Sequence, residues 1–356
     1  MEKQSKAKIQ SLSTLQLIAI ITVVLGHFWV KGSGFMNSAC VAFCFVYSGY
    51  FTARRHQFPP EYGIKEHMRF MWSKLAKFYP LHVLGVFLGL FAAWVSWGGG
   101  VNLKILLAHL TLTSSWIPYS HYFFGVNPVA WYICDLFFLY LMAPVLVRGL
   151  RKLSLAWQVT VVVVLLIAQF TVEACSLLGL YHYYFLYQFP VARLLDFAAG
   201  IIIFNITQCA TWQSIKDRIT PASATWIELA SVISFLILYV VGEKWIHSHC
   251  YRAFCASAPA IVALFVPFIL TSESNGLVSR VMRFRLFEWM STFDAEIYLL
   301  QFGPYFIIQT LLKVSGIELH PVLYFVLQMS ALLLVSWLVH RYYVTPLKRK
   351  LLQHRN

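Results

Sequence analysis

A succession of apolar stretches, each about as long as a membrane-spanning helix, is the feature that most constrains this chain. A helix needs about 20 mostly apolar residues to cross the roughly 30 Å hydrocarbon core of a bilayer. Ten stretches meet this requirement, at 12–30, 37–53, 78–97, 128–147, 156–175, 189–206, 225–242, 257–272, 293–312 and 322–342. The sequence therefore predicts an all-α polytopic transmembrane bundle of about ten spans. We expect one domain over residues 1–356, with no separate soluble domain.

One further stretch, 102–124, is moderately apolar but is interrupted by His109, Pro118 and His121. Irregular backbone at membrane depth is stable only where protein or water surrounds it. We therefore expect this stretch to be interfacial or re-entrant and not an eleventh span.

The positions of the basic residues predict the orientation of the bundle. With an N-terminus inside and ten alternating spans, 22 of the 28 Lys and Arg residues fall in inner segments. This asymmetry favours N-in and C-in, because basic residues concentrate on the cytoplasmic side. The net charge of +14 then reflects topology and lipid headgroups, so we expect a lipid bilayer and no nucleic acid as partner.

Composition and motifs exclude several other classes of protein. Charged residues make up 12% of the chain, about half the share that soluble domains carry, which argues against a cytosolic enzyme. The seven Cys residues lack metal-type spacing, so no metal site is expected, although Cys250 and Cys255 leave a disulfide open. We expect no cleavable signal peptide, because the first apolar stretch lacks a small-residue cleavage site. No hydrolase, zinc-protease or P-loop motif is present.

His27 is the sharpest candidate for chemistry, because an ionisable group within a span is costly. Gln16 precedes it by eleven residues, which turns a helix to within about 20° of three full turns. Both side chains then project from one stripe, about 16 Å apart along the axis. This stripe indicates either a pathway through the membrane or a polar packing seam, and His27 either a reactive group or an interhelical hydrogen bond.

Basic residues gather before the third span, where Arg69, Lys74 and Lys77 are expected at the inner surface. Lys74 and Lys77 are three residues apart and share a helix face. They serve either as topology anchors or as point charges that bind the phosphates of a cytosolic ligand.

Three later spans carry polar side chains at helical spacing. These are Trp131 and Asp135 in the fourth span, Arg193 and Asp196 in the sixth, and Asp294, Tyr298 and Gln301 in the ninth. Arg193 and Asp196 are three residues apart, so they either form a structural ion pair or contact a substrate. Glu296 lies off the stripe of the ninth span. A proton-coupled transporter and an enzyme with a histidine base would both use such groups.

Seven motifs, in order along nearly the whole chain, resemble the acyltransferase 3 family of integral membrane acyltransferases. The first three are the eleven-residue spacing of Gln16 and His27, the segment AFCFVYSGYFTARR with Ser48-Gly49, and the run Lys74-Leu-Ala-Lys77-Phe-Tyr79-Pro80. The others are Trp131 followed by Pro144, then FPVARLLDFAAG, AEIYLLQFGPY and the ending YYVTPLKRK. Each motif is weak alone, but their order on a ten-span frame is specific for the family.

The resemblance implies transfer of an acyl group, commonly acetyl, from cytosolic acyl-CoA to a glycan of the cell envelope. It implies that His27 acts as general base or acyl carrier, with Gln16 and Asp135 beside it in catalysis. It implies that the donor binds at Lys74, Lys77, Arg69 and Tyr79. For the acceptor polysaccharide or precursor it points to Trp131, Arg193, Asp294, Tyr298 and Gln301. A prokaryotic inner membrane is the family's usual location, and no oligomeric state is predicted.

Two positions depart from the family pattern. Gln16 stands where the family has Arg, and Gln301 where it has His. Glutamine donates hydrogen bonds but carries no charge, so it stabilises a developing oxyanion less than arginine does. Either the donor is unusual, or another residue such as Arg193 or Lys77 compensates, or activity is lost. A glycan or small-molecule transporter and an inactive scaffold therefore remain as alternatives.

Overall fold

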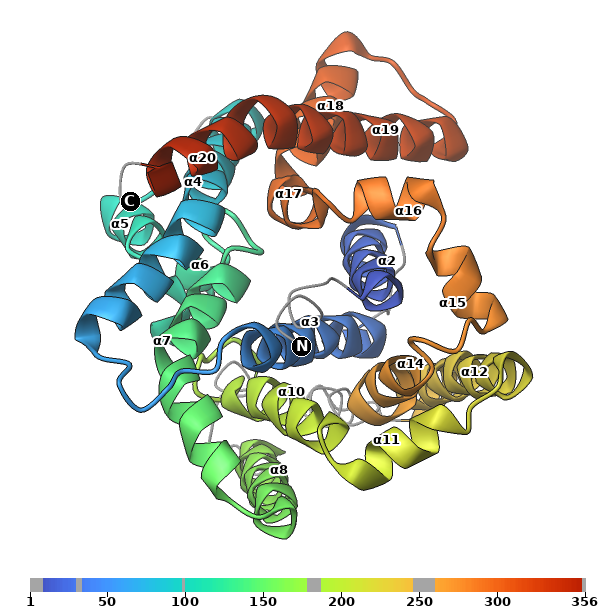
Figure 1. Cartoon of the computed structure of the whole chain (residues 1–356). Coiled ribbons are helices and arrows are strands. Elements are labelled where there is room, and N and C mark those ends of the chain that lie inside the picture. The colour runs from blue at the N-terminus through green and yellow to red at the C-terminus, as the bar shows by residue number, and fades with distance from the viewer. Residues whose placement is uncertain (1–8, 30–33, 98–99, 178–186, 246–259, 354–356) are drawn as a thin grey trace. The chain divides into compact units, whose positions relative to one another are not determined.

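A computed structural model describes residues 9–29, 34–97, 100–177, 187–245 and 260–353, and these residues form helices and no strand (Figure 1). The chain divides into two compact units that interleave in sequence. Unit 1 comprises residues 1–61, 142–187 and 191–292, and unit 2 comprises residues 62–141, 188–190 and 293–356. The division falls within α7 (Trp131–Lys152). That the chain forms one domain stays a prediction.

Unit 1 is organised around α3, which packs against α2 and α10 (Figure 1). Its helices are α2 (Gln10–Phe28), α3 (Gly34–Arg55), α8 (Leu155–Leu177), α10 (Leu194–Thr207), α11 (Ala210–Asp217), α12 (Pro221–Trp245), the π-helix η2 (Ala260–Phe265), α14 (Val266–Leu270), α15 (Leu277–Met282) and α16 (Arg285–Met290). A β-carbon on Gly49 would collide with the Phe197 carbonyl, and one on Gly200 with that of Val46. These glycines therefore set the close approach of α3 and α10, which accounts for the Gly of the Ser48-Gly49 motif.

Unit 2 begins with the long helix α4. Its elements are α4 (Ile64–Trp97), α5 (Leu103–Leu110), the 3₁₀ turn η1 (Ser114–Trp116), α6 (Ser120–Phe123), α17 (Asp294–Leu300), α18 (Phe302–Ser315), α19 (Pro321–Val339), the π-helix η3 (His340–Val344) and α20 (Thr345–Gln353). Both α18 and α20 pack against α4. Residues far apart in sequence therefore meet within this unit. Trp72 Nε1 on α4 donates to the carbonyl of Leu351 on α20 at 3.1 Å, although 279 positions separate the two residues.

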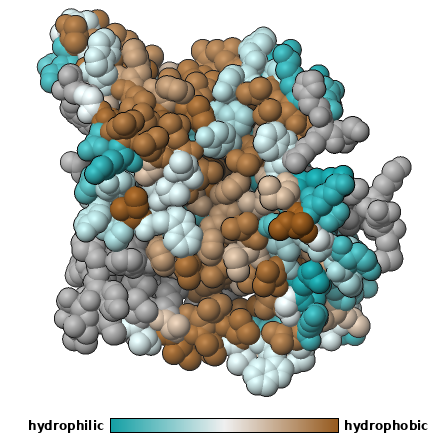
Figure 2. Space-filling view, turned by 90° about the vertical axis from the view of Figure 1, so that its left-hand side faces the viewer, coloured by the Kyte–Doolittle hydropathy of each residue, from teal (hydrophilic) through white to brown (hydrophobic). Residues whose placement is uncertain are grey.

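Among the described residues, four helical segments are long and apolar enough to cross a membrane. They are Gln10–Phe28, Ile64–Val95, Trp131–Lys152 and Pro321–Gln353. Two bent pairs, α10 with α11 at 73° and α17 with α18 at 48°, raise the number to six if each pair is one span. Apolar side chains also cover much of the face shown in Figure 2. The chain is therefore an integral membrane protein, while ten spans and the N-in, C-in orientation stay predictions.

The stretch 102–124 forms three short elements, α5, η1 and α6, and none is long enough to cross a bilayer. Two side chains of α4 satisfy carbonyls at the end of α5: Tyr79 Oη donates to Leu110 at 2.9 Å, and His82 Nε2 to His109 at 2.8 Å. His109 Nε2 in turn donates to the Tyr122 carbonyl at 2.7 Å. Burial, and next the neighbouring His82, lowers the pKa of His109 to about 4. The neutral imidazole of His109 thus joins α5 to α6, and the bonds from Tyr79 and His82 join α5 to α4.

Candidate functional site

The predicted site residues fall into both units. Gln16, His27 and Arg193 belong to unit 1, and the predicted residues of α4, α7 and α17 to unit 2, together with Gln301 at the junction of α17 and α18. In α2, Gln16 is half-buried. The His27 side chain is exposed in the last helical turn, with its ring 6.1 Å from that of Phe28 in an edge-on arrangement. The catalytic role of His27 stays a prediction.

Arg193 forms the ion pair that its spacing allowed. Its Nη1 lies 3.0 Å from Asp196 Oδ2, and both side chains are 2% exposed. Its Nε donates to the Tyr187 carbonyl at 2.9 Å, and its guanidinium lies 4.5 Å from the Tyr187 ring and 5.5 Å from that of Phe45. Buried charges need such partners. Arg193 therefore fixes the start of α10 with contacts from its own unit.

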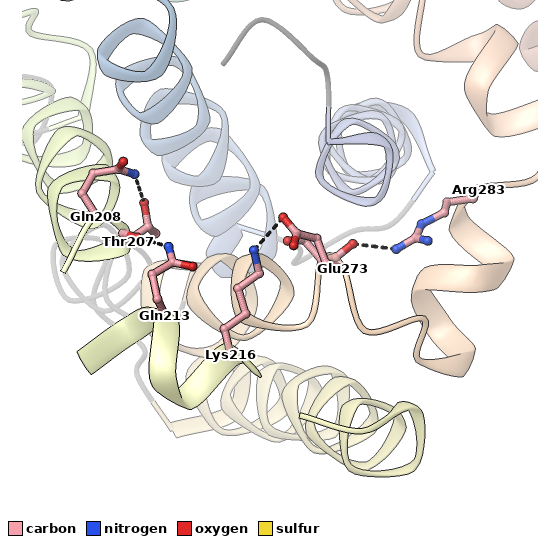
Figure 3. Close-up of polar contacts among 7 residues, drawn as sticks. Thr207, Gln208, Gln213, Lys216, Glu273 and Arg283 are labelled. Atoms are coloured by element: carbon pink, nitrogen blue, oxygen red, sulfur yellow. Dashed lines mark hydrogen bonds and ion pairs between the residues drawn. The ribbon is translucent and has the colours of Figure 1, made fainter. Parts of the chain in front are cut away.

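Polar contacts also fix the bend between α10 and α11 (Figure 3). Gln213 Nε2 donates to the Thr207 carbonyl at 2.7 Å, which satisfies a carbonyl at the end of α10. Lys216 Nζ on α11 lies 2.6 Å from Glu273 Oε1, and Arg283 Nη2 donates to the Ser272 carbonyl at 2.7 Å. These contacts hold the turn after α14 and give no sign of a ligand site.

The basic residues of α4 lie against aromatic rings. Lys74 Nζ is 4.8 Å from the centre of the Phe70 ring and 4.5 Å from that of Tyr140. Lys77 Nζ is 4.5 Å from the Phe78 ring, and Arg69 is exposed. Cation–π contacts position an ammonium group without neutralising its charge. This face of α4 therefore suits an anionic ligand, whereas the Tyr79 hydroxyl already holds α5.

The junction of α17 and α18 is a break at Gln301 in an otherwise apolar segment. Helix breaks free backbone carbonyls, which must be satisfied within a membrane protein. Gln301 Nε2 donates to the Tyr298 carbonyl at 2.7 Å, and Asn127 Nδ2 donates to the Leu299 carbonyl at 2.9 Å. A histidine N–H at position 301 could make the same kind of bond, so the change to glutamine keeps a donor. Asn127 was missed by the sequence reasoning because its partner lies 172 residues away.

The remaining predicted residues lie on α7 and α17. Trp131 and Asp135 are buried in α7. The ring of Tyr132, next to Trp131, meets that of Tyr298 edge-on at 5.1 Å between centroids. Asp294 is half-buried at the first residue of α17, where the helix dipole favours a carboxylate.

A second polar cluster, which the sequence reasoning missed, joins α17 to the C-terminal π-helix. Glu296 Oε1 lies 2.8 Å from His340 Nδ1, and their side chains are 4% and 29% exposed. On the other side of the ring, His340 Nε2 lies 3.4 Å from Thr345 Oγ1. The available signal was Glu296 itself, a carboxylate within the apolar segment AEIYLL.

No group of three or more His, Cys, Asp or Glu side chains that could hold a metal ion occurs in the part of the chain that the structure describes. Cys40, Cys44, Cys134 and Cys209 form no disulfide with one another. The predicted alternative of a Cys250–Cys255 disulfide lies outside the described residues.

Comparisons with known proteins agree with the motif pattern. A family model described as an acyltransferase domain, acyltransferase 3, matches residues 9–341. Acyltransferase MdmB of Streptomyces mycarofaciens is 25% identical over 281 residues, which cover 72% of this chain and 66% of that protein. The chain thus spans just under two thirds of this relative. No solved structure matches.

Proposed function

This chain belongs to the acyltransferase 3 family of integral membrane acyltransferases, and from that premise we propose that it transfers an acyl group, acetyl by family habit, from cytosolic acyl-CoA to a hydroxyl of a cell-surface or precursor glycan. The observation that carries the proposal is the family match over residues 9–341, which includes both His27 and the basic face of α4. We place the reaction in a prokaryotic inner membrane, again from the family.

The donor end of the reaction is assigned to α4. Lys74, Lys77 and Arg69 bind the CoA phosphates as point charges or, for Arg69, as a fork. The aromatic contacts of the two lysines support this role, because they orient the ammonium groups in advance and so reduce the entropy lost on binding.

The acceptor hydroxyl is assigned to His27. The neutral imidazole takes the proton of the acceptor hydroxyl while the oxygen of that hydroxyl attacks the thioester carbonyl. The carbon–sulfur bond then breaks, and the CoA thiolate receives the proton. Gln16 and Asp135 are proposed as catalytic partners. Trp131, Arg193, Asp294, Tyr298 and Gln301 are proposed as acceptor-binding residues, although the structure also gives Arg193 and Gln301 local bonds that stabilise the fold.

A transporter or exporter is the second candidate, and the break at Gln301 is the observation that favours it. Transporters often bind their substrates at discontinuous helices, where carbonyls and amides are exposed to a cavity. Here, however, the Tyr298 and Leu299 carbonyls accept bonds from Gln301 and Asn127. An inactive scaffold is the third candidate. Its support is that Gln16 stands where the family has arginine.

The proposal is tested with inside-out membrane vesicles given radiolabelled acetyl-CoA. We expect the wild type to transfer label to glycan, and His27→Ala to lose transfer by about 100-fold or more, as loss of a general base predicts. His121→Ala is the matched control, because His121 is also exposed. Lys74→Ala with Lys77→Ala should raise the KM for acetyl-CoA.

Unchanged transfer by His27→Ala would refute the assigned mechanism. Absence of transfer from acetyl-CoA and from longer acyl-CoA donors would refute the proposed acyltransferase activity. Glycan flux into liposomes without acyl-CoA would then support the transporter, and absence of that flux the scaffold.

A further inference from the structure

We propose that Glu296, His340 and Thr345 form a nucleophilic site in which Thr345 accepts an acyl group as an ester. The three side chains lie in series: Glu296 Oε1 is 2.8 Å from His340 Nδ1, and His340 Nε2 is 3.4 Å from Thr345 Oγ1. An acid, an imidazole and a hydroxyl in this order make up the triad that activates a nucleophile, on whatever fold it occurs. All three residues belong to unit 2.

The π-helix η3 is what brings Thr345 over the imidazole. In a regular α-helix, residues five apart point about 140° away from each other. The five-residue π-turn His340–Val344 changes the register, because its hydrogen bonds join residues five apart. Such turns are rare and occur frequently at functional sites. The same sequence in an α-helix would therefore separate the base from the hydroxyl.

Glu296 fixes the proton on the correct side of the ring. An ionised carboxylate only accepts hydrogen bonds, so His340 Nδ1 donates to Glu296 Oε1. In the neutral ring, Nε2 then presents its lone pair to Thr345 Oγ1. This is the tautomer in which His340 can remove the hydroxyl proton. The distance of 3.4 Å is loose, as is common for nucleophile–base pairs without substrate.

Burial and neighbours distinguish the cluster from a packing bridge. The Glu296 side chain is 4% exposed, whereas that of His340 is 29% exposed and Thr345 is half-buried. The acid is thus shielded while the base and the hydroxyl remain accessible. The Phe293 ring lies 6.2 Å from that of His340, on the side of α17.

The cluster is fastened to the helix that carries the proposed donor site. Tyr343 Oη, within the π-turn, donates to the Pro80 carbonyl of α4 at 3.4 Å, and α20 packs against α4. Lys77 precedes Pro80 by three residues. A thioester donor whose phosphates bind at α4 is therefore held on the same unit as the Thr345 hydroxyl.

The step balances with the donor of the proposed function, on which this inference rests. Thr345 Oγ1 forms a bond to the thioester carbonyl carbon while His340 takes the hydroxyl proton. The carbon–sulfur bond breaks, and His340 returns the proton to the CoA thiolate. The products are an acyl-threonine ester and CoA. In place of direct attack on the thioester, the acceptor oxygen then bonds to the acyl carbon of this ester. The bond from that carbon to Thr345 Oγ1 breaks, and Oγ1 receives the proton of the acceptor hydroxyl.

The test uses the purified full-length chain in detergent with two donors, acetyl-CoA and p-nitrophenyl acetate, each quenched in acid. Mass spectrometry of the peptides should find acetyl on Thr345, with either donor. Thr345→Val should abolish the label and Thr345→Ser retain it. His340→Gln should slow labelling by about 100-fold or more, the usual contribution of a general base. Thr160→Val is the control, because Thr160 is an exposed helical threonine whose hydroxyl donates to the Ala156 carbonyl.

The outcomes separate this inference from the proposed function. Acetyl transfer to glycan by a chain that never carries acetyl on Thr345 overturns the inference alone. Labelling of Thr345 by p-nitrophenyl acetate but not by acetyl-CoA supports the triad and overturns the donor. Labelling by neither donor, or labelling that is unchanged in His340→Gln, overturns the triad. A thermal midpoint of Thr345→Val close to that of the wild type shows that its loss of label is not a failure to fold.

Discussion

Two contacts between an acidic and a basic side chain, one described in each unit, differ in ways that separate structure from chemistry. Arg193 and Asp196 are three residues apart, are both 2% exposed, and sit between the Tyr187 carbonyl and two aromatic rings. Glu296 and His340 are 44 residues apart, and the imidazole is 29% exposed with a hydroxyl on its far side. Arginine stays protonated in proteins, whereas histidine exchanges protons near neutral pH. The first pair is suited to holding a helix and the second to moving a proton.

The largest expected effect on stability comes from removing one partner of the buried Arg193–Asp196 ion pair. Arg193→Ala leaves Asp196 buried without its cation, which costs about 3–5 kcal/mol, so the variant should lose much of its thermal stability in detergent. Arg193→Met with Asp196→Leu should recover most of the loss, because neither charge then stays buried. His340→Gln should be milder, because glutamine still donates to Glu296. A thermal midpoint for Arg193→Ala that matches His340→Gln would contradict the distinction.

His109 is a histidine that, unlike His340, is as fully buried as Arg193. Its side chain is fully buried, and burial together with the nearby His82 lowers its pKa from 6.5 to about 4. Between these values the unfolded chain binds a proton that the folded chain excludes. Stability should therefore fall as the pH drops from about 6.5 to about 4, by about 3 kcal/mol in all, and stay level above that window.

The pH dependence is measured as the thermal midpoint in detergent across this window. His109→Gln should flatten the curve, because glutamine does not titrate. The variant should still fold, since glutamine can donate to the Tyr122 carbonyl as the imidazole does. His121→Gln is the matched control, because His121 is exposed on the adjoining α6. An equally steep curve for His109→Gln would assign the dependence to other groups.

The helix break in unit 2 gives a smaller effect through neutral groups. Asn127→Ala leaves the Leu299 carbonyl without its amide donor, at a cost of about 1–3 kcal/mol. Gln301→Leu should cost a similar amount through the Tyr298 carbonyl, whereas Gln301→His should retain most of the stability. The thermal midpoints of the three variants check this. Equal losses for Gln301→His and Gln301→Leu would show that shape and not the donated bond matters at this position.

How much of the structure can be predicted from the sequence depends on how far apart in the chain the contacting residues lie. The apolar stretches predict helical segments, and a spacing of three residues predicts the Arg193–Asp196 contact, because both follow from local helical geometry. Helix breaks and π-turns follow from tertiary packing, so the sequence 293–312 reads as one continuous span although the structure bends it by 48°. Glu296 and His340 meet only because α17 and α19 pack together. The resemblance to a family supplied candidate residues that spacing alone leaves ambiguous.

The smallest expected effect belongs to the ion pair with the shortest distance. Lys216 Nζ and Glu273 Oε1 are 2.6 Å apart, closer than Arg193 and Asp196 at 3.0 Å, but the Glu273 side chain is 76% exposed (Figure 3). Water screens such a pair, and holding two long side chains together costs entropy, so exposed pairs contribute about 0–1 kcal/mol. Lys216→Ala should therefore shift the thermal midpoint slightly, and less still at high salt. If it were as damaging as Arg193→Ala, distance and not burial would rank the ion pairs of this protein, and the contrast between the two units would lose its physical basis.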